Sequence, residues 1–381
     1  MKKTRLLFFA ALATAAFNFS SCSDDDKPTF NIPTTDIDGD AYTMGGDLRL
    51  LYSIDNGANY STTVPTNIGK DVHVLVKLNN GTTDLTTDDF DIDWTGSSPA
   101  PTVAESGVAE FVASTNIAVQ VSVTDKMTLV TSHRANGKFF AVNTTTGALT
   151  ESFTPMYADA ALTGVRGFVY HYKKGLYYAS LNTDKGGYLY TINPSTKAAT
   201  RINENDGANG AEVWDAVVNW AVAADDSLIA IGDFNGDGNG VVKFGTDGGR
   251  STKTAEADIC CALGMLYDAT AGEFQIANGE NANEGEVIID RVTNAGVFVG
   301  ESVTMSLAGF SDDFSGDYIY LRTMAKSPTG EVYGTLYSAE FKKTYFVKIN
   351  IASATVTYVT TLGENNENQY NSLAFIPNYT L

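Results

Sequence analysis

The stretch YLYTINPSTKAAT occupies residues 188–200. Its first five positions are mostly aromatic or β-branched, as is typical of a β-strand. Asn193 to Thr196 are residues that favour turns, and Pro194 holds its own φ near the value that a turn needs. The remaining residues return to a short strand pattern. The stretch therefore predicts two strands joined by a tight turn.

This strand–turn–strand pattern occurs five times after residue 126. The other copies are FFAVNTTTGALT at 139–150, VVKFGTDGG at 241–249, residues 287–299, and YFVKINIASATVT at 345–357. A second hairpin precedes four of the copies, at 168–181, 220–231, 263–277 and 324–337. One unit is thus four strands in about 50 residues, which is typical of a β-propeller blade.

We count five blades in residues 126–381, and degraded copies in long stretches such as 302–323 leave room for six or seven. A parallel β-solenoid is the alternative, although its rungs are shorter and do not come as paired hairpins. Residues 372–377 form one more strand pattern with no blade after it, while the first repeat lacks an initial strand. We expect the two to pair, because closing the ring covers edge strands.

The turns NPSTK and NTTTG resemble those of secreted bacterial propellers related to the quinoprotein, NHL and lactonase-like families. The resemblance implies a fold and not a chemistry. Residues 30–125 carry a separate series of alternating strand patterns with Trp94 midway and a closing VQVSVTD. They resemble bacterial immunoglobulin-like and polycystic-kidney-disease-type modules, which implies a two-sheet β-sandwich of about this size.

The N-terminus has a basic head, MKKTR, and an apolar run that ends at Phe17. Such a run is too short to span a membrane and indicates a secretory signal over residues 1–21. Cys22 and the acidic tract after it resemble a bacterial lipoprotein signal and the surface-export signal of Bacteroidota. The resemblance implies that Cys22 is lipidated and that 22–29 is a tether. The protein would then be anchored in the outer membrane and face the cell exterior.

Charge narrows the classes of partner. The formal net charge is −20, with 45 acidic and 25 basic side chains. Such a field repels nucleic acids and anionic lipid surfaces, so contact with the membrane is expected through the lipid anchor only. Apolar residues make up 43% of the chain, which is enough to bury a substantial core.

The stretch DFNGDGNG at 233–240 has oxygen-bearing side chains at alternate positions. Ca²⁺ takes such ligands from a loop that turns at glycine. The stretch resembles the calcium loop of FG-GAP-type propeller repeats, and Asp233, Asn235 and Asp237 match its first three side-chain ligands. Val241 stands where that family has an Asp, so one carboxylate is missing. The two hypotheses are a structural calcium site and a plain hairpin turn, which needs the same residues for positive φ.

Sequence motifs for catalysis are sparse: the three histidines are far apart, and no nucleophile elbow or phosphate loop occurs. We expect ligand binding on the face whose loops lead into the innermost strands, because those loops combine aromatic, amide and carboxylate side chains. Arg166 would offer a cation to an anionic ligand or pair with a neighbouring carboxylate. For Trp214, burial between blades is the alternative. The candidate residues are Tyr157, Arg166, Trp214, Asp215, Phe314 and Tyr370.

Taken together, these features resemble the Bacteroidota accessory lipoproteins that capture nutrients for a TonB-dependent outer-membrane transporter. The resemblance implies non-covalent binding of a glycan, cobalamin or siderophore on a propeller face, followed by delivery to the transporter. A protein-binding or adhesive surface module is the first alternative. A propeller-type hydrolase or lyase is the second, because two carboxylates on different blades can meet at the channel.

Overall fold

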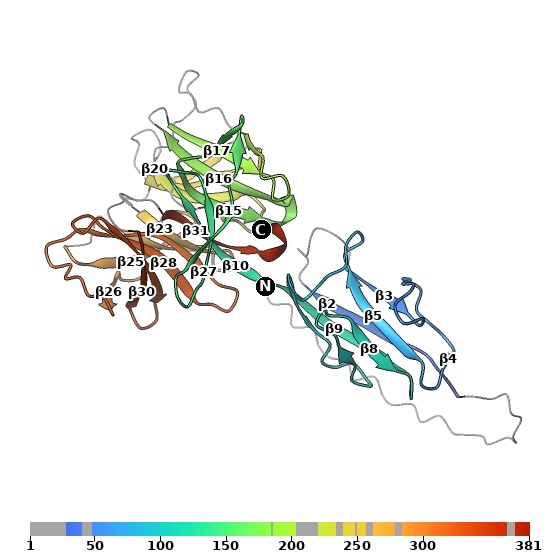
Figure 1. Ribbon diagram of the computed structural model, residues 1–381. Coiled ribbons are helices and arrows are strands. Elements are labelled where there is room, and N and C mark those ends of the chain that lie inside the picture. The colour runs from blue at the N-terminus through green and yellow to red at the C-terminus, as the bar shows by residue number, and fades with distance from the viewer. Residues whose placement is uncertain are drawn as a thin grey trace, which may run out of the picture. The chain divides into compact units, whose positions relative to one another are not determined.

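In the computed structural model, the described residues are 28–39, 48–183, 186–202, 220–233, 239–247, 250–256, 262–278, 284–363 and 370–381. They fold into strands with two short 3-10 turns (Figure 1). The chain divides into two compact units, residues 1–124 and 125–381, which we call the N-terminal unit and the propeller unit. In the part of the chain that is described, no helix is long and apolar enough to cross a membrane.

The N-terminal unit contains two larger sheets, with strand orders β2-β9-β6 and β3-β5-β8-β7. Alternation of polar and apolar residues builds them: in β5, Val74, Val76 and Leu78 are buried while the residues between them are not. Its immunoglobulin-like class stays a prediction. The strands are β1 (Thr29–Phe30), which pairs with β4 (Ile68–Gly69), β2 (Thr34–Gly39), β3 (Arg49–Ser53), β5 (His73–Asn79), β6 (Phe90–Asp93), β7 (Thr102–Val103), β8 (Ala109–Val112) and β9 (Ala118–Asp125).

The described residues of the propeller unit form five four-stranded antiparallel blades. Blade 1 is β31 (Tyr370–Pro377), β10 (Met127–His133), β11 (Phe139–Val142) and β12 (Leu149–Phe153). Blade 2 is β15 (Val165–His171), β16 (Leu176–Thr183), β17 (Gly186–Ile192) and β18 (Ala199–Arg201). Blade 3 is β19 (Ala221–Val222), β20 (Leu228–Asp233), β21 (Asn239–Phe244) and β22 (Arg250–Glu256). Blade 4 is β23 (Ala262–Asp268), β24 (Glu273–Asn278), β25 (Val287–Thr293) and β26 (Val303–Ala308). Blade 5 is β27 (Ile319–Lys326), β28 (Val332–Ser338), β29 (Lys343–Asn350) and β30 (Thr355–Gly363).

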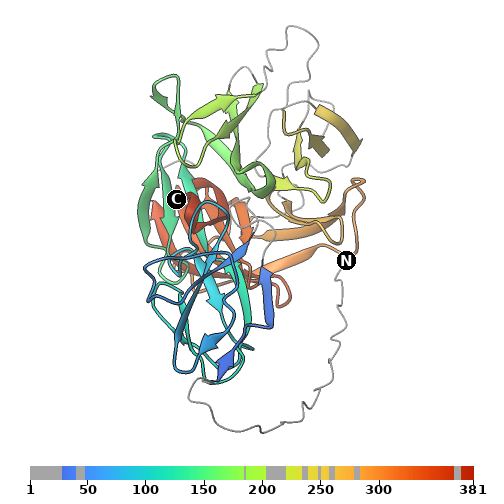
Figure 2. The ribbon, with the colours of Figure 1, turned by 90° about the vertical axis from the view of Figure 1, so that its right-hand side faces the viewer.

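The ring closes through β31, which pairs antiparallel with β10 from Met127↔Pro377 to His133↔Tyr370. β31 also lies against β15 of blade 2 and β27 of blade 5, and β23 lies against β27. Figure 2 shows the blades following one another around a centre, from teal through green, yellow and orange to red. The chain therefore has the all-β propeller fold that its repeats predict, with five blades in the described residues, and the C-terminal strand completes blade 1 as expected.

The core of the propeller unit lies between neighbouring blades. Tyr178 and Leu189 of blade 2 pack with Trp220 and Phe244 at blade 3, and all four are at most 5% exposed. The Trp220 and Phe244 rings meet edge to face with centroids 5.1 Å apart. Burial at about 25 cal/mol per Å² of apolar surface makes such interfaces the main stabilising term.

Blades 4 and 5 share an additional contact at their outer edges. β26 pairs in parallel with β30 over Ser306↔Thr355, Leu307↔Val356 and Ala308↔Thr357. The two blades thus form one eight-stranded sheet. This join covers part of the two outer edges, which propeller blades ordinarily leave unpaired.

Candidate functional site

Two inner strands carry a β-bulge close to their first residues. In blade 2, Val165 pairs with Leu181 and Gly167 with Ser180, so Arg166 is the extra residue. In blade 5, Leu321 pairs with Leu336 and Thr323 with Thr335, so the extra residue is Arg322. A bulge twists the strand locally and redirects the side chain of the extra residue. The two arginines therefore occupy the same special position in two blades.

Two further inner strands have a bulge at the same level. In β31, Ser372 pairs with Ser132 and Tyr370 with His133, which leaves Asn371 as the extra residue. In β23 the register shifts between Ala262 and Met265. Because the inner strands of a propeller all run in one direction, the four bulges lie toward the same end of the channel. We call this end the channel mouth, and it is the face to which the loops before the inner strands lead.

Arg134 joins the two bulge arginines at the channel mouth. It directly follows β10, and its backbone oxygen accepts a hydrogen bond of 2.7 Å from the Gly164 amide, two residues before Arg166. Burial lowers the pKa of Arg166, and the charge of Arg134 lowers it further. Burial likewise lowers the pKa of Arg322 to about 10, with contributions in the same direction from Arg166 and Arg134. We call these three residues the arginine cluster.

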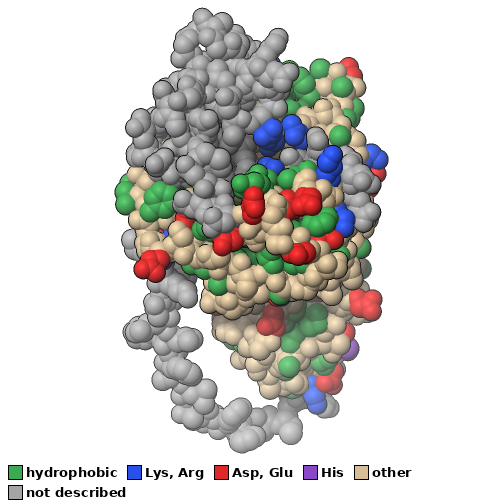
Figure 3. All heavy atoms as spheres, turned by 90° about the vertical axis from the view of Figure 1, so that its left-hand side faces the viewer, with side chains coloured by type: hydrophobic (Ala, Val, Ile, Leu, Met, Phe, Trp, Pro, Cys, Tyr) green, Lys and Arg blue, Asp and Glu red, His purple; other side chains and the backbone are tan. Residues whose placement is uncertain are grey.

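Within the described part of the chain, the arginine cluster has no carboxylate partner. The ion pairs between described residues include none of the three guanidinium groups. The Nε atoms of Arg166 and Arg322 are buried and have no hydrogen-bond acceptor among the residues that the structure describes. Unpaired cations are unusual in a chain of net charge −20, because carboxylates are abundant. On the face drawn in Figure 3, several basic side chains lie close together, with acidic side chains below them.

Aromatic side chains lie beside Arg322 and at the start of β31. The Arg322 guanidinium lies 4.7 Å from the Tyr320 ring centroid and 5.4 Å from that of Tyr337. Tyr370 meets the His133 ring edge to face at 5.2 Å, and burial raises the pKa of its hydroxyl. These rings keep the guanidinium in a partly desolvated setting, where it interacts strongly with an anion.

The structure brings together two of the residues predicted from sequence. Arg166 and Tyr370 lie near the start of β15 and at the start of β31, which are neighbouring inner strands. Tyr157 lies instead in β13 (Met156–Tyr157), which pairs with β14 (Ala160–Ala161), and the preceding Met156 forms a bridge with Ala198 next to outer strand β18. The residue is 37% exposed, and its ring meets that of Tyr190 with centroids 5.1 Å apart. Tyr157 is thus a surface residue at the outer part of blade 2.

Phe314 does not face a ligand surface. It is 5% exposed and packs against Phe310 at 5.2 Å and Tyr345 at 5.7 Å. The adjacent Asp312 accepts a hydrogen bond of 2.6 Å from the Tyr345 hydroxyl, so even this acidic turn is anchored to the core. We therefore leave Phe314 out of the candidate site.

Several predicted residues lie outside the described part of the chain. They are Cys22, Trp214, Asp215, Asn235 and Asp237. Asp233 is the last residue of β20 and pairs in register with Asn239, so the DFNGDG stretch connects β20 to β21. Among the described residues, no three His, Cys, Asp or Glu side chains are grouped closely enough to hold a metal ion.

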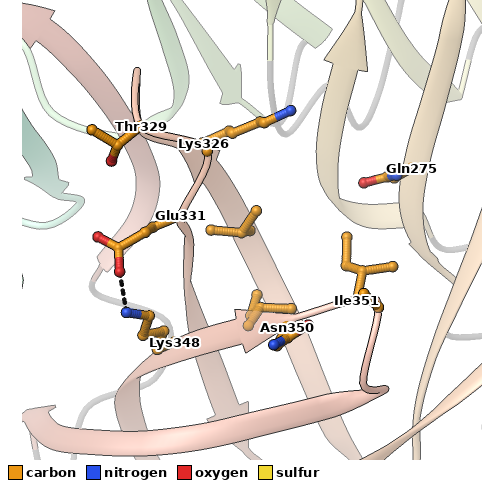
Figure 4. A pocket seen from close by; sticks show the side chains of 11 residues that line it. Gln275, Lys326, Thr329, Glu331, Lys348, Asn350 and Ile351 are labelled. Carbon is orange, nitrogen blue, oxygen red and sulfur yellow. Dashed lines mark hydrogen bonds and ion pairs between the residues drawn. The ribbon is translucent and has the colours of Figure 1, made fainter.

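A pocket of about 530 Å³ lies at the other end of blade 5 (Figure 4). Lys326, the last residue of β27, borders it together with Gln275 and Ile351. Its remaining charged groups already interact, because Glu331 forms an ion pair with Lys348 and accepts a hydrogen bond of 3.0 Å from Tyr333. The channel mouth, by contrast, contains three arginines without a carboxylate partner among the described residues. It is therefore the better candidate for a ligand-binding site.

The sequence has no match among family models, and no curated protein matches it. Among solved structures, the endo-arabinase of Bacteroides thetaiotaomicron is similar at a TM-score of 0.42 and 11% identity, covering 60% of this chain and 97% of that chain. The periplasmic gluconolactonase of Pseudomonas aeruginosa gives 0.37 and 9%, covering 63% and 84%. TolB of Acinetobacter baumannii gives 0.36 and 12%, covering 87% and 68%. The propeller assignment rests on the blades and their closure described above.

Proposed function

We propose that this protein is a lipid-anchored cell-surface propeller that binds a nutrient ligand at the channel mouth. The bound ligand would then be delivered to a TonB-dependent outer-membrane transporter. The observation that carries the binding step is the arginine cluster, whose guanidinium groups have no carboxylate partner among the described residues. Keeping cations partly buried and unpaired costs stability, and ligand sites are where proteins tolerate that cost.

We infer the location of the protein from its first residues. Lipidation at Cys22 would hold it at the outer membrane, and the acidic segment 22–29 would act as tether. Labelling with a lipid precursor and substitution of Cys22 by Ala test this step. Loss of both the label and the membrane-bound fraction on substitution is the expected result, whereas unchanged membrane attachment would exclude the anchor.

A thermal-shift screen of residues 23–381 tests the binding step. A ligand that binds only the native protein raises its melting temperature once its concentration passes the dissociation constant. The panel contains plant and host glycans, cobalamin and ferric siderophores. We expect a saturable shift with one class, lost on Trp214→Ala and kept in Phe298→Ala, a control residue that is 42% exposed and lies between β25 and β26. If no small molecule shifts the melting temperature, a protein-binding surface module becomes the better account.

We also propose a structural calcium ion in the β20–β21 connection, held by Asp233, Asn235 and Asp237. Such an ion would fix a loop of the outer part of blade 3 without taking part in chemistry. The same screen with calcium and with chelator tests it. Turnover of a panel glycan during the screen would instead indicate the hydrolase or lyase alternative.

A further inference from the structure

We propose that the arginine cluster binds the carboxylate groups of an acidic ligand, and that Arg322 and Arg166 are its specificity-determining residues. This inference rests on the proposed capture function. It replaces the three ligand classes, glycan, cobalamin and siderophore, by one chemical feature, a ligand that carries carboxylate groups. Two sources present that chemistry: an acidic saccharide built from uronic acids, and a ferric polycarboxylate complex.

Three guanidinium groups converge at the channel mouth. Arg166 and Arg322 are bulge residues of blades 2 and 5, whose inner strands both lie against β31. Arg134 adds a third charge from blade 1, at the end of the strand that pairs with β31. Like charges repel, so such a group persists only where something other than the three side chains stabilises it.

The donors left open set the ligand chemistry. Each guanidinium is a planar fork of N–H donors that matches the two oxygens of a carboxylate. Because Arg322 also lies over the rings of Tyr320 and Tyr337, its orientation is restricted before any ligand arrives. A neutral glycan offers only hydroxyl groups. A hydrogen bond from a guanidinium group to a hydroxyl is weaker than one to a carboxylate. The site therefore favours acidic ligands over neutral glycans and over cobalamin, whose phosphate charge is offset within the molecule.

Calorimetric titration of residues 23–381 tests the inference with three probes. Trigalacturonic acid and ferric citrate represent the two carboxylate sources, and maltotriose is the neutral control. The variants are Arg322→Gln and Arg166→Gln. Arg291→Gln is the matched control, because that arginine pairs with Glu273 on the surface of blade 4 and lies on β25, the third strand of its blade.

We expect one of the two acidic probes to bind, and the one that binds identifies the source. Loss of one charge-assisted hydrogen-bonded pair weakens binding about 10- to 100-fold, so Arg322→Gln and Arg166→Gln are each expected to do so while Arg291→Gln does not. Affinity for the acidic probe is also expected to fall as salt is added, since charges at the mouth are screened.

Melting of the ligand-free variants gives an independent readout. If the cluster serves a ligand, Arg322→Gln removes an unpaired desolvated charge and leaves the melting temperature unchanged or higher. A merely structural arginine would instead lower it on substitution. A lower melting temperature of Arg322→Gln overturns the inference, and so does the absence of binding by both acidic probes. Binding of maltotriose unaffected by Arg322→Gln would also overturn it, yet leave the capture function standing.

Discussion

Ring closure by the C-terminal strand can be tested at Ile376. This side chain is fully buried and packs with Val130, Phe139 and Phe168, which belong to blades 1 and 2. In β31 it pairs with Thr128. Its apolar contacts exist only if β31 completes blade 1 and lies against blade 2, so Ile376→Ala measures the contribution of closure.

The expected magnitude follows from burial. Ile376→Ala removes three carbon atoms, which at about 0.8 kcal/mol per buried group amounts to about 2.4 kcal/mol. The cavity left behind adds to this, because a closed ring cannot collapse around it, and measured substitutions of this kind cost roughly 2–5 kcal/mol. We expect a loss of about 3–4 kcal/mol, or roughly 10 °C in melting temperature for a unit of this size.

Urea unfolding followed by circular dichroism measures the loss, with melting as a second readout. Val297→Ala is the matched control, because this valine is 59% exposed between β25 and β26 and its truncation changes stability by about 0.5 kcal/mol at most. If Ile376→Ala costs no more than Val297→Ala, residues 370–377 do not close the ring and the reasoning fails.

Three other predictions concern a turn, an ion pair and a metal. Gly137→Ala should lower the melting temperature by several degrees more than Gly164→Ala. Both glycines have positive φ, but of the two only Gly137 would place an added Cβ against backbone, 2.6 Å from the Leu162 oxygen. Hydrogen bonds from Ser227 and Lys243 lower the pKa of Asp225 to about 2, so its stabilisation is complete above its ordinary pKa and is lost as pH falls toward 2. Asp225→Asn should reduce the loss of unfolding free energy at acid pH, by less than about 1 kcal/mol because the carboxylate is exposed. Urea unfolding at several pH values measures this loss, and an equal loss in the parent protein and the variant would contradict the prediction. Calcium should raise the melting temperature of the parent protein and not of Asp237→Asn, and equal curves with calcium and chelator would exclude the site.

The repeats were predictable because strand period and turn residues are local properties. Residues 188–200 and 345–357 show the hairpin pattern directly, and the blades form there. Closure by 372–377 was predictable as well, since a strand pattern without a blade needs a partner. The same local logic failed at Phe314, where neighbouring aspartates suggested an exposed loop and Phe310 and Tyr345 in fact surround the ring.

The arginine cluster could not be predicted from single segments. Whether a strand residue bulges depends on its register with a partner strand, and that register is a property of the pair. Convergence of Arg134, Arg166 and Arg322 further requires that the ring be closed. One signal was present: Arg166-Gly167-Phe168 and Arg322-Thr323-Met324 share the order arginine, small residue, apolar residue at equivalent points of their blades.

The parallel join between β26 and β30 has a consequence for how the ring opens. Blades that share a sheet lose protection from hydrogen exchange together, so blades 4 and 5 should behave as one cooperative unit while blades 2 and 3 fluctuate separately. Blades 4 and 5, which include Arg322, should then be the more rigid part of the ring. Blade 2, which carries Arg166, should be the more flexible part. An anion that contacts both Arg166 and Arg322 would restrain blade 2 against blade 5. Ligand binding should therefore slow amide hydrogen exchange in blade 2.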